Sequence, residues 1–262
     1  MLGAIVGDIV GSIYEFNNIR RKDFELFSPR CFVTDDSIMT LAIAQALVES
    51  YPTYESLQES VIHWMKLLGH MYPSAGYGSH FEMWIFSRQT NSYNSCGNGS
   101  AMRVSPVSYA GNTIEQVIEL SQIVTAVTHD HPEGLKGAEA TAVAIYMARM
   151  GESLDTIRQH ILEHYYTIDF TCDELRNSYT FDGTCQGTVP QAMQCFFESH
   201  SFEDAIRNSI SIGGDSDTIG AIAGSIAGAY YGIPEDIAHI ASNYMDERQK
   251  EILHNFEIKF MR

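Results

Sequence analysis

The residues best suited to chemistry are carboxylates and hydroxyls that crowd two short segments of the sequence. The first is Thr34-Asp35-Asp36-Ser37, and the second is Gly213-Gly214-Asp215-Ser216-Asp217-Thr218-Ile219-Gly220. Each precedes an apolar stretch with helical periodicity, so both predict the start of a helix. Asp and Thr are good N-caps, and acidic groups there interact favourably with the helix dipole. One interpretation of both segments is therefore a pair of ordinary helix caps.

The number of carboxylates supports a second interpretation, a shared metal site. A cap needs a single acceptor, whereas each segment brings two carboxylates beside a buried apolar helix. Buried carboxylates repel one another and resist losing water unless a cation neutralises them. An all-oxygen donor set suits Mg²⁺, Mn²⁺ or Ca²⁺ better than zinc or copper. The spacing alone leaves both the caps and the metal site open.

A third polar segment has the composition of a phosphate-binding loop. It reads Ser95-Cys96-Gly97-Asn98-Gly99-Ser100-Ala101-Met102-Arg103. Its glycines free the backbone to present N–H groups, and Arg103 adds a planar fork that suits phosphate. A plain Gly/Asn turn has the same composition and is the commoner explanation.

Two further segments contain groups that bind zinc or attack substrates in other proteins. His129 and His131 stand before Pro132, but no thiolate or third histidine is near them in the sequence. This favours a helix start with one histidine facing a cleft over a zinc site. Cys185 is a candidate nucleophile, although a lone cysteine more often contributes packing.

The elements that must position these groups are predicted to be helices. Apolar residues recur at helical spacing, or alanine is abundant, in several stretches, and no segment alternates as a strand does. These stretches are 57–68, 133–150, 154–165, 190–199, 202–210, 236–241 and 247–256. Pro190 suits the first turn of its helix, because a proline there loses no needed donor. We therefore expect an all-α protein with long irregular segments at 17–33, 72–105 and 167–188.

Glycines spaced by four residues mark two more helices. They are Gly3, Gly7 and Gly11 in one helix, and Gly220, Gly224, Gly228 and Gly232 in the other. A glycine inside a helix costs about 1 kcal/mol relative to alanine, so each row needs a compensating contact. A flat stripe lets two backbones approach closely, which predicts that both helices lie at the centre of a bundle. The flanking carboxylates disfavour the alternative, a membrane dimer motif.

Composition excludes several classes of protein. The 262 residues carry a formal charge of −17, and 45% of them are hydrophobic, which is typical of a globular chain. The acidic balance argues against partners such as nucleic acid or an anionic membrane. Five cysteines without C-x-x-C spacing and no signal peptide indicate a cytoplasmic protein without a disulfide framework. Because no linker interrupts the chain, we expect one domain over residues 1–262; the composition does not indicate an oligomeric state.

Taken together and in order, the motifs resemble those of the ADP-ribosylglycohydrolase family. They are Gly3-Ala4-x-x-Gly7-Asp8-x-x-Gly11 with Tyr14-Glu15, Thr34-Asp35-Asp36, Gly97-Asn98-Gly99-x-Ala101-Met102-Arg103, Thr128-His129-x-His131-Pro132, Gly187-Thr188-Val189-Pro190-x-Ala192 and Gly213-Gly214-Asp215-x-Asp217-Thr218. This resemblance implies a compact orthogonal all-α bundle with a central dinuclear site for two divalent cations, Mg²⁺ or Mn²⁺. It favours the metal interpretation of the two acidic segments over the twin caps.

The resemblance also implies roles for individual residues. The implied metal ligands are Thr34, Asp35, Asp36, Asp215, Asp217 and Thr218. The implied substrate-binding residues are Glu15, Ser95, Cys96, Gly97, Asn98, Gly99, Ser100, Met102, Arg103 and His129. Among the catalytic residues, Asp35 or Asp36 would take a proton from a water molecule. The third, Glu15, matches a glutamate that contacts or gates the metal and ribose in some members.

The implied activity is metal-dependent hydrolysis of the glycosidic bond between ADP-ribose and an acceptor, which is a protein side chain or a small conjugate. Such a cleavage passes through an oxocarbenium-like state, and divalent cations can orient the ribose and activate water. Cations also explain how an acidic protein accepts an anionic substrate. Three alternatives remain. They are a dinuclear phosphoesterase that would release AMP from a nucleotide, a non-catalytic module that binds ADP-ribose, and a structural relative, which should have lost metal ligands although Asp36, Asp215 and Asp217 are present.

Overall fold

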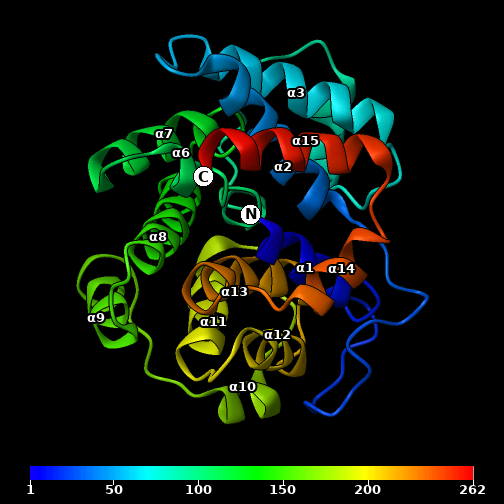
Figure 1. Ribbon diagram of the computed structural model, residues 1–262, viewed down its shortest axis with the longest axis vertical. Helices are drawn as coiled ribbons and strands as arrows, with labels where there is room; N and C mark the ends of the chain where they lie inside the picture. Colours follow the sequence, from blue (N-terminus) through cyan, green and yellow to red (C-terminus); the bar gives the residue numbers. More distant parts are fainter. Residues whose placement is uncertain (262) are drawn as a thin grey trace.

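The computed structural model describes residues 1–261 and confirms the all-α prediction. Within these residues no β-strand forms, and the helices share one continuous hydrophobic core. They cross one another at steep angles, as α8 does relative to α15 (Figure 1). In chain order they are α1 (Leu2–Gly11), α2 (Asp35–Ser50), α3 (Leu57–Met71), α4 (Ser79–Phe86), α5 (Gly99–Met102), α6 (Val107–Ala110), α7 (Ile114–Ala126), α8 (Pro132–Arg149), α9 (Leu154–His164), α10 (Cys172–Ser178), α11 (Cys185–Phe197), α12 (Phe202–Ser211), α13 (Ser216–Tyr231), α14 (Glu235–Ser242) and α15 (Glu247–Phe260).

The two glycine-striped helices, α1 and α13, pack against each other, as predicted (Figure 1). A Cβ added at Gly3 would overlap the carbonyl of Gly224, and one added at Gly7 would overlap that of Gly220. The pairing is antiparallel, because the neighbour of Gly11 is the backbone of α13 at its first turn. The C-terminal end of α1 therefore lies directly beside the N-terminal end of α13.

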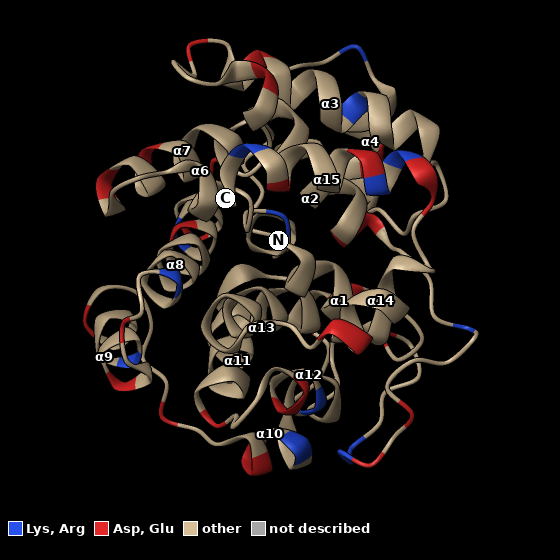
Figure 2. Cartoon of the chain, viewed as in Figure 1, with Lys and Arg blue, Asp and Glu red and all other residues tan. Residues whose placement is uncertain are grey.

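Helix α13 is almost free of charge along its length. Figure 2 shows it in tan, whereas most charged residues lie on the outer helices and loops. Asp217 in its first turn is its one charged residue, and every residue from Ser216 to Ala227 is buried. A single carboxylate on a buried apolar helix requires compensation from its surroundings.

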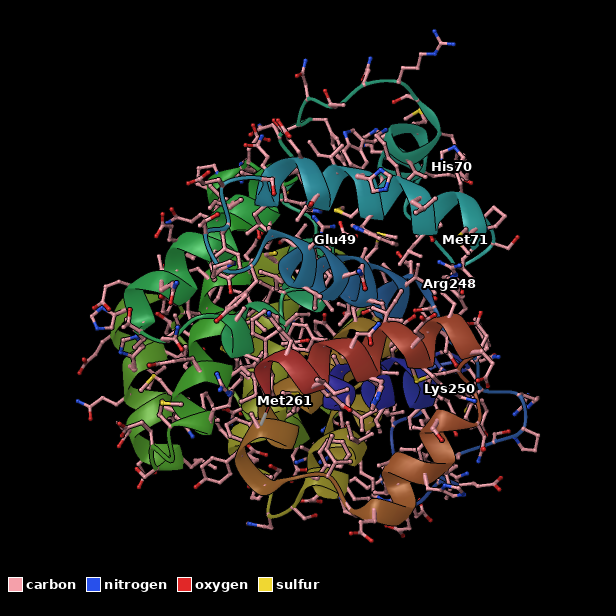
Figure 3. All side chains as sticks on the ribbon, turned by 45° about the horizontal axis from the view of Figure 1, so that its top comes forward. Glu49, His70, Met71, Arg248, Lys250 and Met261 are labelled. Carbon is pink, nitrogen blue, oxygen red and sulfur yellow. The ribbon has the colours of Figure 1, made fainter. Side chains whose placement is uncertain are left out.

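Helix α2 is also buried, because it lies between α3 and α15 (Figure 3). The indole N–H of Trp64 on α3 donates to Oε2 of Glu49 near the end of α2 at 2.7 Å. The labelled His70 and Met71 lie at the C-terminal end of α3, on the outside of this layer (Figure 3). The N-terminal end of α2, which carries Asp35 and Asp36, points into the middle of the molecule.

The helix boundaries differ from the prediction in three places. Gly232, predicted to lie in the second glycine-striped helix, follows its last residue, Tyr231, with a φ of +75°, so it takes no part in the contact with α1. Helix α11 begins at Cys185, where the Thr184 side chain accepts the Gly187 N–H, so Pro190 lies inside the helix rather than in its first turn. The segments predicted to be irregular at 72–105 and 167–188 contain α4, α5 and α10. These helices have eight residues or fewer, too few turns to show a clear period.

None of the helices in residues 1–261 combines the length and apolar character needed to cross a membrane.

Candidate active site

A cavity of about 360 Å³ lies between the N-terminal ends of α2 and α13. All the predicted site residues except Thr34, Cys96 and Ser100 line it. The full lining is Glu15, Asp35, Asp36, Gly76, Gly78, Ser79, His80, Phe81, Tyr93, Ser95, Gly97, Asn98, Gly99, Met102, Arg103, His129, Phe181, Gly183, Asp215, Asp217 and Thr218. The fold thus brings together polar segments that are up to about two hundred residues apart in the sequence.

The N-terminal end of α2 is capped without help from its own carboxylates. The hydroxyl of Thr34 accepts the Asp36 N–H at 3.3 Å and donates to Oδ1 of Asp8 at 2.6 Å. Asp8, buried on α1, also accepts the N–H groups of Thr34 and Ser37 at 3.1 Å and the Ser37 hydroxyl. Neither Asp35 nor Asp36 serves as the cap, so both are available for another purpose.

The Asp36 carboxylate is buried with one oxygen unpaired. Its Oδ2 lies 3.4 Å from the Thr34 hydroxyl and 3.3 Å from the Thr218 hydroxyl, whereas Oδ1 has no hydrogen-bond partner among the described residues. An unsatisfied buried oxygen is costly, and more so when it is charged. This oxygen is an unused acceptor on a carboxylate that lies close to those of Asp8 and Asp217.

The N-terminal end of α13 is built differently. Asp215 occupies the N-cap position, but its side chain accepts no hydrogen bond from the first turn of the helix. Its Oδ2 instead accepts the Asn98 side-chain N–H at 2.7 Å. The preceding Gly213 and Gly214 have φ values of +68° and +78°, a conformation that favours glycine. A tight turn therefore delivers Asp215 to the cavity, where it does not cap the helix.

Carboxylate oxygens converge between the N-terminal ends of α2 and α13 in two overlapping groups. Oxygens of Asp8, Asp36 and Asp217 lie within 4.8 Å of one another, and so do those of Glu15, Asp215 and Asp217. Asp217 belongs to both groups and is therefore at their centre. Both Asp8 oxygens already accept hydrogen bonds from the start of α2. Of the other four carboxylates, Asp36, Asp215 and Asp217 each accept a protein hydrogen bond through one oxygen, whereas Glu15 accepts none from residues 1–261.

Burial perturbs the acid–base behaviour of every carboxylate that lines the cavity. It raises the pKa of Glu15 to about 7 and that of Asp35 to about 8, and the charges of neighbouring carboxylates add to both effects. Burial also raises the pKa of Asp215, and it raises the pKa values of Asp36 and Asp217 well above the usual range. The ionised cluster therefore needs either protons or a positive charge.

A hard divalent cation fits these residues. The donors are carboxylates and the Thr218 hydroxyl, an all-oxygen set that suits Mg²⁺ or Mn²⁺. The unpaired Asp36 Oδ1 supplies a lone pair that no group within residues 1–261 uses.

The glycine-rich segment forms one wall of the cavity. The Asn98 N–H donates to the Gly183 carbonyl at 2.8 Å, and its side chain holds Asp215 and Thr188. The backbone of this segment lies close to His129. A Cβ added at Gly97 would lie 3.5 Å from His129 Nε2, and one added at Gly99 would lie 3.4 Å from it.

Cys96 and Ser100 support this wall from behind. The Ser100 hydroxyl donates to the Gly134 carbonyl at 2.9 Å, and the Cys96 carbonyl accepts the Cys185 N–H at 2.9 Å. Cys185 is buried against these groups, and burial raises the pKa of its thiol to about 12. This geometry matches a packing role for Cys185.

Arg103 and His129 form a buried polar pair on the cavity wall. Nη2 of Arg103 donates to the Thr128 hydroxyl at 2.8 Å and lies 3.3 Å from Nδ1 of His129. Burial and the Arg103 charge lower the pKa of His129 well below its usual value, so the imidazole is neutral. His131 instead caps α8 by accepting the Glu133 N–H, as expected for a helix start with one histidine facing a cleft.

Sequence reasoning assigned no role to several residues that shape the site. Asp8 had a detectable signal, because a lone carboxylate in an apolar glycine-striped helix requires a buried partner. The aromatic lining residues, His80, Phe81, Tyr93 and Phe181, come from segments predicted to be irregular, where no local pattern marks them.

Comparison with known proteins identifies the relatives of this chain. The model of the ADP-ribosylglycohydrolase family matches residues 1–255. Human ADP-ribosylhydrolase ARH3 is 26% identical, over 90% of this chain and 85% of that protein. ADP-ribosylarginine hydrolase Tri1 of Pseudomonas putida is 24% identical, over 96% of this chain and 76% of that protein.

Among solved structures, one described as an ADP-ribosylglycohydrolase-related protein complex has the same fold. Its TM-score is 0.66 at 22% identity, and the match covers 97% of this chain and 94% of that chain. The motifs, the cavity and the family match agree: the chain belongs to the ADP-ribosylglycohydrolase family and is an enzyme of that class.

Proposed function

We propose that this enzyme uses divalent cations to cleave the glycosidic bond between ADP-ribose and a modified acceptor. The acceptor is a protein side chain or a small conjugate; the name of the relative Tri1, an ADP-ribosylarginine hydrolase, gives one such linkage for that protein. The observation that carries the proposal is the convergence of carboxylates around Asp217, together with the unpaired Asp36 oxygen.

The proposed cation ligands come from both helix starts. They are Thr34, Asp35, Asp36, Asp215, Asp217 and Thr218. The Thr34 hydroxyl, which already has two protein partners, contributes its remaining lone pair. When bound, two Mg²⁺ or Mn²⁺ ions would supply Lewis acidity that makes water nucleophilic near neutral pH and would hold the ribose hydroxyls.

We assign the proton acceptor to Asp35. Its backbone N–H is fixed to the Ala75 carbonyl at 2.9 Å, and its side chain lines the cavity near Gly76. Asp36, the other candidate, is more deeply buried, and its Oδ2 faces two hydroxyl groups. An oxygen of Asp35 is therefore better placed to take the proton from a water molecule that attacks the anomeric carbon.

The remaining lining residues bind ADP-ribose. Glu15, in the loop that follows α1, faces the ribose, and the backbone around Asn98, with Ser95 and Arg103, contacts the diphosphate. The neutral His129 offers Nε2 to the nucleotide, because its Nδ1 is held by Thr128.

Three other residues complete the proposed substrate site. Met102 forms an apolar part of the wall, and Cys96 and Ser100 hold the loop in shape from behind. Because lining residues come from Glu15 to Thr218, we propose that residues 1–262 act as one domain.

The experiment that tests this function is product analysis. Peptides carrying ADP-ribose on arginine or on serine are incubated with the protein and Mn²⁺ or Mg²⁺, and the products are separated by mass. We expect intact ADP-ribose and unmodified peptide, both abolished by EDTA and restored by added cation. Release of AMP would instead indicate a phosphoesterase, and binding of ADP-ribose without turnover would indicate a binding module.

A further inference from the structure

Asn18 makes an unusual set of contacts for an exposed loop residue. Its Nδ2 donates to the carbonyl of Tyr14 at 2.7 Å, to that of Glu15 at 3.0 Å and to that of Gly214 at 2.9 Å. Its Oδ1 accepts the Gly214 N–H at 2.8 Å. One side-chain amide thus pairs with both backbone groups of a residue 196 positions away and with the backbone that carries Glu15.

The turn to which Asn18 is hydrogen-bonded is the one that places Asp215 in the cavity. Gly214 directly precedes Asp215, and its neighbour Gly213 lies against the guanidinium of Arg20. Arg20 donates to the carbonyl of Ile212 and, at 2.7 Å, to that of Tyr179. Two side chains of one loop therefore hold this turn.

Glu15 needs such a tether because no hydrogen bond from the described part of the chain holds its carboxylate in place. Its oxygens lie within 4.8 Å of those of Asp215 and Asp217, where like charges repel. No residue within 1–261 donates a hydrogen bond to this carboxylate, and residues 12–34 form no helix. Without a restraint on the backbone, repulsion would turn Glu15 towards solvent.

The loop around Glu15 is restrained at both ends. Before it, Gly11 is in backbone contact with Asp217, and after it Asn18 is bonded to Gly214. We infer that Asn18 is a positioning residue, which fixes Glu15 opposite Asp215 and Asp217 by tying the two backbones together. This inference rests on the proposed function, in which these carboxylates hold cations and ribose.

The test uses three variants and a double-mutant cycle. Asn18→Ala removes all the side-chain hydrogen bonds of Asn18. Asn18→Asp keeps the acceptor for the Gly214 N–H but loses the Nδ2 donors. The matched control is Asn17→Ala, an exposed neighbour without a side-chain hydrogen bond among the described residues. Combining Asn18→Ala with Glu15→Gln shows whether Asn18 acts through Glu15. The measurements are kcat, KM and the Mn²⁺ dissociation constant.

Asn18→Ala and Asn18→Asp should each lower kcat by about tenfold or more, because misplacing a reacting group by about 1 Å can cost on the order of a hundredfold. Their Mn²⁺ dissociation constants should rise several-fold, and the Asn17→Ala protein should match the wild type. In the Glu15→Gln background, Asn18→Ala should have little further effect. Wild-type kinetics and Mn²⁺ affinity in Asn18→Ala, or an equal loss in both backgrounds, would overturn the inference.

Amide hydrogen exchange of the metal-free proteins separates this inference from the proposed function. Asn18→Ala should speed exchange in residues 12–20 and at Gly214, while Asn17→Ala should not. Unchanged exchange in Asn18→Ala would refute the tether whatever reaction is catalysed. If the wild type releases no ADP-ribose, but Asn18→Ala speeds exchange and Asn17→Ala does not, the proposed function fails and the tether stands.

Discussion

The starts of α2 and α13 have similar sequences and different construction. At the start of α2, Thr34 and Asp8 satisfy the backbone, so that Asp35 and Asp36 are additional to the cap. At the start of α13, Asp215 has the cap position but bonds to Asn98 instead of the helix backbone. The comparison shows two ways to build a Thr/Asp-rich helix start. At α2 the N-cap residue caps the helix itself, whereas at α13 the N-cap carboxylate bonds elsewhere and Asp217 accepts the Thr218 N–H at 3.0 Å.

The difference has an energetic consequence. A satisfied cap stabilises its helix by about 1 kcal/mol, whatever the cavity contains. Buried carboxylates that repel one another destabilise the protein until a cation compensates them. We therefore expect the cap at α2 to contribute stability at all times, and the carboxylates at α13 to do so only when a cation is bound.

The largest effect is expected for Asp217→Asn. Asp217 belongs to both carboxylate groups, so removing its charge should release or displace a cation and lower turnover by about a hundredfold or more. Helical content should not change, because asparagine keeps the size and the capping ability of aspartate. Circular dichroism, metal content and ADP-ribose release are measured on one preparation, with the exposed Asp23→Asn as the control. A folded variant with full activity and metal would contradict the site assignment.

Gly7→Leu should force α1 away from α13. Because Asp8 on α1 supports the start of α2, this change should also separate the starts of α2 and α13. A side chain at Gly7 meets the Gly220 carbonyl, a backbone atom that cannot rotate away, and Gly224→Leu meets the Gly3 carbonyl in the same way. We expect each change to cost about 3 kcal/mol or more in urea unfolding. The control is Gly78→Ala, whose Cβ has open space. Wild-type stability in both leucine variants would show that the glycines are not contact points.

The third prediction compares the two helix starts in the absence of metal. Thr34→Ala removes a cap and should lower the free energy of unfolding by about 1 kcal/mol. Asp215→Asn removes one of several repelling charges and keeps an acceptor for Asn98, so it should leave the stability unchanged or raise it. Urea unfolding in EDTA measures both. Equal losses in the two variants would mean that Asp215 is a cap after all.

The smallest effect is the pH dependence of the melting temperature. Burial raises the pKa of Glu15 to about 7 and that of Asp35 to about 8, so the folded protein binds these protons more tightly than the unfolded chain does. Their contribution to stability is present at about pH 4 and is lost as the pH rises through 7 to 8. The metal-free protein should therefore melt a few degrees lower at pH 8 than at pH 5.

Saturating Mn²⁺ should remove most of this decline, because a bound cation stabilises the ionised carboxylates. Differential scanning fluorimetry at several pH values, with EDTA or with Mn²⁺, measures the effect. The same decline with and without Mn²⁺ would show that these carboxylates do not respond to a cation.

Much of the fold could be predicted from local patterns. The glycine rows predicted the contact between α1 and α13, because only a close approach of backbones explains glycine every four residues in a helix. The position of Pro190 was predicted wrongly, because the helix, capped by Thr184, begins at Cys185, five residues before the expected start. The short α4, α5 and α10 have too few turns for their periods to be read.

The candidate site was predictable in its residue types but not in its connections. The motifs named the carboxylates that line the cavity, yet the sequence could not show that Thr34 is a true cap and that Asp215 is not. That distinction depends on Asp8 and Asn98, which reach these positions only through tertiary packing. Asn18 is further from prediction still, because its partner Gly214 is 196 residues away.

The central claim is that the starts of α2 and α13 hold divalent cations between them. Crystals of the protein grown with Mn²⁺ test this most directly, through an anomalous difference map at the manganese edge. We predict peaks within bonding distance of Asp36 Oδ1 and the Asp217 carboxylate, and their loss in Asp217→Asn. A map without peaks between the two helices, from protein that releases ADP-ribose in EDTA, would contradict the account.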